Sequence, residues 1–199
     1  MSKQIWLCAA LALVACGKKD GDKAKESKAP PVAIDIAAVN ALVPAALKDK
    51  IVFEQRTIEL EQGRKHRKFT LAVPKNWTLQ DKMFGMVKAD DKGGFFSKLT
   101  IGDSCGGACE AGKDWAKVAD GEQFANRAKG KVEKDDKGAG RRTMISVDDN
   151  TKVTNVNTAW WTDGASRYFD CSYDLDESIK DAAPAFEKAC SAVNVEGDD

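Results

Sequence analysis

The sequence predicts an α+β fold in which helices cover the apolar face of an antiparallel sheet. In many short segments apolar residues alternate with polar ones, as they do in half-buried strands. Turns rich in glycine and aspartate join these segments in pairs, which is typical of antiparallel hairpins. At the start, middle and end of the chain, apolar residues recur instead at steps of three and four, the spacing of amphipathic helices. The predicted order is therefore helix, four strands, helix, four strands, helix.

The first half of this order begins with a short amphipathic helix over residues 34–50. Pro44 splits this helix or opens its second half, because proline lacks the N–H that a helix interior uses. A charged turn at 61–67 and an Asp-Asp-Lys-Gly-Gly turn at 90–94 each separate two strands. The four strands are expected at 50–60, 68–74, 83–89 and 97–103.

The second half begins with a helix over residues 113–129, where the apolar spacing changes back to the helical period. The next four strands are expected at 130–136, 141–149, 152–161 and 166–175. Asp163-Gly164, between the last two of them, is a strong hairpin signal. A final helix lies within 178–194, and Pro184 indicates that its regular part begins late, with Asp181 as the expected N-cap.

The stretch RKFTLAVPKNWTL resembles the opening strand of PsbP-like domains, in which a strand ends in Val-Pro and a tryptophan follows. Those residues are Phe69, Val73, Pro74 and Trp77 here. The order of elements over 51–194 is also similar to that family's, which implies a PsbP-like α/β/α sandwich. The family includes an extrinsic protein of the photosynthetic oxygen-evolving complex and bacterial lipoproteins of unknown role. Its members share no catalytic residues, so the resemblance implies none for this chain.

The amino-terminal segment predicts export from the cytoplasm. Residues 1–15 combine Lys3 with an apolar run that is shorter than the roughly 20 residues needed to span a bilayer. Leu13-Val14-Ala15-Cys16 then resembles the lipobox of bacterial lipoproteins, in which a signal peptidase cuts before a lipidated cysteine. An ordinary secretory signal with a chance cysteine is the alternative. Gly17 favours the outer membrane over the inner membrane, because aspartate at this position is the retention signal in enterobacteria-like sorting.

Composition predicts a tether followed by one domain. Residues 16–33 join Cys16 to a segment with almost no apolar side chains, which is expected to be disordered and to end in a stiffer Pro-Pro pair. Residues 34–199 have the length of a single globular α+β domain. The whole chain holds 31 basic and 31 acidic residues, and loss of residues 1–15 removes one basic residue, giving a net charge of −1. Nothing in this balance suggests nucleic-acid binding, which calls for a strongly basic face.

Export would place the remaining cysteines in an oxidising compartment, where disulfides persist. Cys171 shares one face of a predicted strand with Phe169 and Tyr173, and Cys190 lies on the apolar stripe of the last helix. If that helix packs on that face, the two sulfurs meet. We therefore expect a Cys171–Cys190 disulfide, with two buried free thiols as the alternative.

Cys105 and Cys109 flank the small residues Gly-Gly-Ala, which allow the chain to turn back on itself. We expect a tight structural disulfide here, provided that the Cα atoms lie within about 4.4–6.8 Å. A redox-active pair is the sharper alternative, although thioredoxin-type pairs have two intervening residues and these have three. No metal site is expected, because zinc needs about four ligands and the single histidine lies in another loop.

Trp160 and Trp161 are adjacent, so on a strand their side chains point to opposite faces. One belongs to the core, and the other could stack on a sugar or on a partner side chain. Packing of both tryptophans is the preferred interpretation, and a binding role for one of them is the alternative.

Together these patterns predict a non-catalytic, lipid-anchored protein of the bacterial envelope, most simply on the periplasmic face of the outer membrane. Its expected role is protein interaction or assembly at the membrane, and neither a catalytic residue nor a cofactor is expected. The alternatives are a small-ligand or glycan binder that uses Trp160 or Trp161, and a thiol oxidoreductase that uses Cys105 and Cys109.

Overall fold

A computed structural model describes residues 33–62, 65–83, 86–91, 97–104, 130–138, 140–160 and 168–197. Residues from Pro31 onward form one compact unit. Among the described residues, no helix has both the length and the apolar character needed to cross a bilayer.

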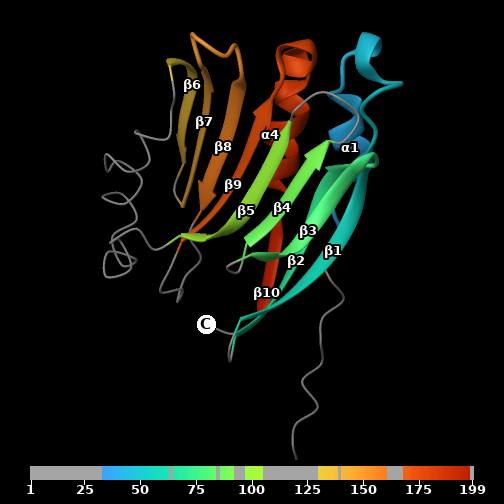
Figure 1. Cartoon of the computed structure of the whole chain (residues 1–199), viewed down its shortest axis with the longest axis vertical. Coiled ribbons are helices and arrows are strands. Elements are labelled where there is room, and N and C mark those ends of the chain that lie inside the picture. Colours follow the sequence, from blue (N-terminus) through green and yellow to red (C-terminus); the bar gives the residue numbers. More distant parts are fainter. Residues whose placement is uncertain are drawn as a thin grey trace, which may run out of the picture. The chain divides into compact units, whose positions relative to one another are not determined.

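The described residues form ten strands in two antiparallel sheets (Figure 1). The smaller sheet has the order β1-β2-β10, with bounds Phe53–Gln62, Lys65–Pro74 and Asn194–Gly197. The larger sheet has the order β3-β4-β5-β9-β8-β7-β6. Its strands in chain order are β3 Trp77–Met83, β4 Met86–Asp91, β5 Lys98–Ser104, β6 Lys131–Gly138, β7 Arg141–Val147, β8 Thr154–Trp160 and β9 Tyr168–Leu175. The coarse prediction of a sheet-rich α+β fold is confirmed, but the strands divide between two sheets.

The predicted hairpins are present. β1 pairs with β2, β4 with β5, β6 with β7, and β8 with β9, each in antiparallel register. In the first pair Ile58 lies opposite Phe69, and both side chains are buried. Alternating apolar residues and short turns therefore located these pairs correctly.

Two strands were not expected from the sequence. β3 contributes two inward apolar residues, Trp77 and Leu79, before its sequence becomes polar and charged, so its alternation is weak. β10 has only four residues, and it forms because Asn194–Gly197 pairs with the free edge of β2. That edge exists only once the chain has folded, so no local pattern could reveal this strand.

The first predicted helix is divided at Pro44. α1 spans Ile36–Ala41, and its N-cap Asp35 accepts a hydrogen bond from the Ala38 N–H at 2.9 Å. Pro44 is the N-cap of the 3₁₀ helix η1, Ala45–Leu47. Proline lacks the N–H that would continue α1, so the second half starts as a separate turn.

The regular part of the last helix begins late, at Ala183, as Pro184 predicted, but the prediction of Asp181 as its N-cap is wrong because Ala182 occupies that position. A 3₁₀ helix, η3 (Glu177–Ala182), runs directly into α4 (Ala183–Ser191). The chain therefore needs its cap before η3, where Asp176 accepts a hydrogen bond from the Ser178 N–H at 2.9 Å. Hydrogen bonds from Ser178 lower the pKa of Asp176. The helix expected at 113–129 lies outside the described residues.

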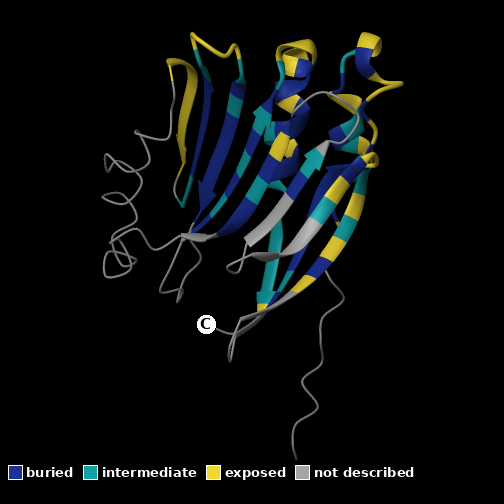
Figure 2. Cartoon of the chain, viewed as in Figure 1, coloured by how far each residue is buried: buried dark blue, intermediate teal, exposed yellow. Residues whose placement is uncertain are grey.

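The core lies between the sheets and α4, which packs against β2, β8, β9 and α1 (Figure 2). At its centre Phe186 of α4 contacts Phe53, Trp77 and Tyr173, with ring centroids 5.0, 5.8 and 4.8 Å away. The Tyr173 hydroxyl donates a 2.9 Å hydrogen bond to the Ala72 carbonyl, and burial raises the pKa of this tyrosine. One helix side chain thus connects both sheets.

The Cys171–Cys190 disulfide is present. It joins β9 to α4 across a Cα–Cα distance of 5.5 Å, and both residues are fully buried. The prediction from the strand face and the helix stripe is therefore confirmed. The bond fastens α4 to the centre of the larger sheet.

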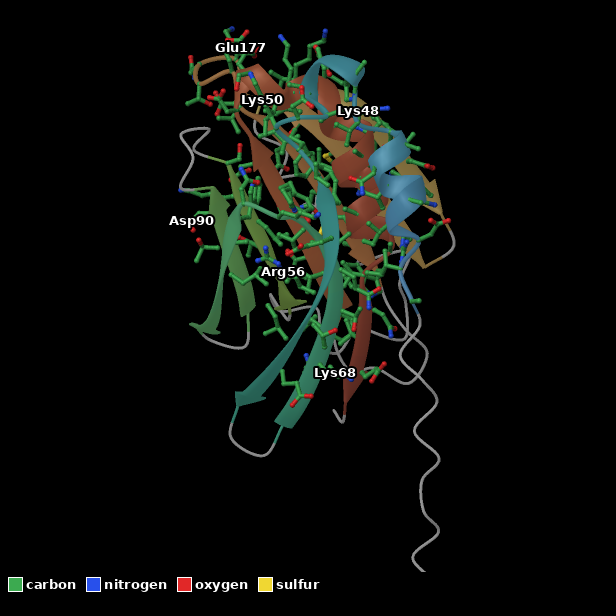
Figure 3. All side chains as sticks on the ribbon, turned by 90° about the vertical axis from the view of Figure 1, so that its right-hand side faces the viewer. Lys48, Lys50, Arg56, Lys68, Asp90 and Glu177 are labelled. Atoms are coloured by element: carbon green, nitrogen blue, oxygen red, sulfur yellow. A yellow bond between two sulfur atoms is a disulfide. The ribbon has the colours of Figure 1, made fainter. Side chains whose placement is uncertain are left out.

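Arg56 of β1 also links the two sheets, through hydrogen bonds to the chain at the start of β3 (Figure 3). From β1, its guanidinium donates hydrogen bonds to the carbonyl of Trp77, the first residue of β3, at 2.8 Å and to the carbonyl of Lys75 at 2.7 Å. Glu54 accepts a third hydrogen bond from it at 2.7 Å. Three carbonyl or carboxylate partners fix the guanidinium in one orientation.

Candidate binding cleft

A cleft of about 500 Å³ lies between the edge of the larger sheet and the junction of η3 with α4. β6, β7 and β8 form one wall, and the helical junction forms the other. Its lining residues are Glu133, Lys134, Ile145, Val147, Lys152, Thr154, Glu177, Lys180, Asp181, Ala183 and Pro184. Three lysines and three carboxylates thus surround a small group of apolar side chains.

Two ion pairs occupy part of the cleft rim. Lys134 of β6 contacts Glu187 of α4 at 2.5 Å, and Lys180 contacts Glu177 at 3.5 Å. All four side chains are at least one-fifth exposed. Exposed pairs of this kind contribute about 0–1 kcal/mol to stability, so a bound group can compete for either partner at little cost.

Lys152 reaches the cleft from the turn between β7 and β8. Its φ of 59° is the one positive φ among the described residues other than glycine, a conformation that costs an ordinary side chain free energy. Asp148 holds this turn: its side chain accepts hydrogen bonds from the N–H groups of Asn150 and Thr151 at 2.8 and 3.0 Å. Its carbonyl accepts one from the Lys152 N–H at 2.9 Å. The turn therefore presents a strained, exposed lysine at the cleft.

Glu133, Lys152 and Asp181 line the cleft without an ion pair to any other described residue. Their charges are available to a ligand, whereas Ile145 and Ala183 supply a buried apolar surface beside them. The arrangement suits a ligand or an extended peptide that carries both signs of charge. In the part of the chain that the structure describes, the acidic, histidine and cysteine side chains form no cluster suited to holding a metal ion.

The opposite face of the same strands is polar although it is buried. Arg142 of β7 donates two hydrogen bonds to Asp135 of β6, at 2.8 and 2.9 Å, and these lower the pKa of the aspartate. Ser146 Oγ and Asn157 Oδ1 are buried and have no hydrogen-bond partner among the described residues. An unsatisfied buried hydrogen-bonding group costs about 1–3 kcal/mol.

The predicted site residues fall into two groups. Trp160 is buried, with its ring stacked on Phe169 at 5.8 Å and the Arg141 guanidinium over it at 5.8 Å. Trp160 therefore packs in the core and offers no ring face to a ligand. Cys16, Cys105, Cys109 and Trp161 lie outside the described residues.

The cleft itself was not predicted, because its residues come from strands and helices that are distant in the sequence. Lys134 and Glu187 are separated by 53 positions, so only the packed structure brings them together.

No protein-family model matches this sequence, and no curated protein matches it at a significant level. What the chain does must therefore be inferred from its own residues and their arrangement.

Proposed function

We propose that this chain is a lipid-anchored bacterial envelope protein whose PsbP-like domain is a non-catalytic interaction or assembly module. The observation that carries the proposal is the aliphatic-small-cysteine border at Leu13-Val14-Ala15-Cys16, directly before a charged tether. In this proposal Cys16 bears the acyl chains, and Gly17 directs the protein to the periplasmic face of the outer membrane. Two or more acyl chains are needed for stable attachment, because each buried CH₂ contributes about 0.8 kcal/mol.

The buried disulfide supports this proposed location outside the cytoplasm. Disulfides persist in the periplasm and at cell surfaces and are rare in the cytosol. Cys171 and Cys190 are bonded and lie in the core, as expected of a structural disulfide in an exported domain.

The cleft supports an interaction role. Its rim carries both signs of charge around an apolar floor, and its ion pairs are exposed enough to exchange partners. We assign the contact with an envelope protein to this cleft. A small zwitterionic ligand is the second candidate, because about 500 Å³ lies within the range of small-molecule sites.

One experiment in living cells tests the anchor and the cleft together. The wild-type protein is expected to incorporate labelled palmitate and to fractionate with membranes, whereas Cys16→Ser is expected to lose both properties. A photo-crosslinking amino acid at Lys152 is expected to yield a discrete adduct. The same group at Lys75, an exposed residue that does not line the cleft, serves as the control.

Palmitate on the Cys16→Ser protein, or none on the wild type, would contradict the anchor. Equal adducts from Lys152 and Lys75 would contradict the assignment of the cleft while leaving the anchor intact. If the protein crosslinked at Lys152 gains only the mass of a small molecule and not that of a protein, the second candidate would be favoured.

A further inference from the structure

β6 is the terminal strand of the larger sheet, so one of its two edges has no partner strand among the described residues. All eight of its residues are exposed (Figure 2). Among the described residues, no strand pairs with this edge. An uncovered edge presents a row of unpaired N–H and C=O groups that can pair with another strand.

Two of the charged side chains of β6 are held against the domain. Lys134 pairs with Glu187 on the α4 side of the sheet, and Asp135 pairs with Arg142 on the other side. The two side chains therefore lie on opposite faces of the sheet, and neither covers the backbone groups of its edge. These pairs leave the backbone of the strand open to a partner.

Charged residues usually protect an edge strand from pairing with another strand. If all the charges have the same sign, two copies of the strand repel each other in every pairing register. β6 instead mixes three lysines with three acidic residues, in the sequence KVEKDDK. β1, the edge of the smaller sheet, carries three glutamates and one arginine and would repel a second copy of itself. Balanced charge thus distinguishes β6 from this other long edge.

The charge pattern of β6 is self-complementary when two copies run in opposite directions. In the register that places Lys131 opposite Asp136 of the second copy, Glu133 lies opposite Lys134 of that copy, and symmetry doubles both pairs. A β-bulge between Val132 and Lys134 inserts one residue. Lys131 and Asp136 consequently lie on the same face of the sheet, opposite Val147 and Thr143 of β7, as a cross-strand ion pair requires.

We propose that two copies of this chain associate through antiparallel pairing of their β6 edges, which joins the two larger sheets into one continuous sheet. Opposite-charge pairs select the partner strand, and backbone hydrogen bonds across the edge hold it. The association does not depend on the lipid anchor, although attachment to one membrane would raise the effective concentration of the copies.

Charge reversal at exposed positions tests this pairing without fixing its register. An acidic variant carries Lys131→Glu and Lys137→Glu, and a basic variant carries Glu133→Lys and Asp136→Lys. The protein is purified in excess detergent, and its association is followed by analytical ultracentrifugation over a concentration series. The control, Lys48→Glu with Lys50→Glu, makes the same change in net charge as the acidic variant, but at exposed residues outside β6 (Figure 3).

The wild type and the control are expected to form dimers, whereas each β6 variant alone is expected to associate at least about tenfold more weakly. An equimolar mixture of the acidic and basic variants is expected to associate more strongly than either variant alone, because opposite charges meet again in three of the four cross-strand pairs of this register. A wild type that is monomeric at every concentration would overturn the proposal. So would a mixture that fails to associate, or a dimer that β6 charges do not affect, the result expected if copies merely share a micelle.

Discussion

Phe186→Ala is expected to lower the free energy of unfolding by about 3–5 kcal/mol, the largest effect of any single substitution considered. Phe186 is fully buried, and its ring lies within 5.8 Å of the ring centroids of Phe53, Trp77 and Tyr173. Truncation leaves a cavity between α4 and both sheets, which cannot close without moving the helix that the disulfide fastens. Urea unfolding followed by circular dichroism measures the change.

Two companion variants make this result interpretable. Phe186→Leu keeps most of the side-chain volume and is expected to lose clearly less stability, so it remains measurable if the alanine variant does not fold. Lys188→Ala lies on the exposed side of the same helix and is expected to change stability by no more than about 0.5 kcal/mol. If Phe186→Ala costs no more than Lys188→Ala, the described packing of α4 is wrong.

Loss of the Cys171–Cys190 disulfide is expected to lower the free energy of unfolding by about 3 kcal/mol, in the range of measured and loop-entropy values for bridges of this size. The bond closes a loop with a sequence separation of 19, and its removal frees that segment in the unfolded chain. Cys171→Ala, Cys190→Ala and the double variant are compared by urea unfolding. Substitution is preferable to a reductant, because a reductant would also act on the disulfide expected between Cys105 and Cys109.

The pattern among these three variants is more informative than any single value. Either single substitution already breaks the bond, so each is expected to cost nearly as much as the double variant. Additive losses would indicate that the two thiols contribute only by packing, and the disulfide would then add no stability of its own.

The sequence predicted those parts of the fold that have a local pattern. Alternation and turns located the β1–β2 and β8–β9 pairs, and the apolar stripe on the last helix correctly placed Cys190 against Cys171. Pro44 marked the break after α1, because proline lacks the N–H that a helix interior uses, whatever the surrounding fold.

Features that depend on distant contacts were missed. β10 exists because β2 offers it an edge, and the division into two sheets follows from that pairing rather than from any hairpin. Asp181 was expected to be the N-cap of the last helix, but the 3₁₀ helix η3 precedes that helix. Asp176 is the N-cap of η3. The cleft combines β6, the turn at Lys152 and the η3–α4 junction, whose proximity no spacing in the sequence encodes.

Intact-mass analysis of the protein extracted from membranes and alkylated without reduction tests the central claim most directly. The account predicts a chain that begins at acylated Cys16 and in which Cys171 and Cys190 carry no alkyl group. A first residue other than Cys16, a Cys16 without acyl chains, or alkylation of the two core cysteines would contradict it.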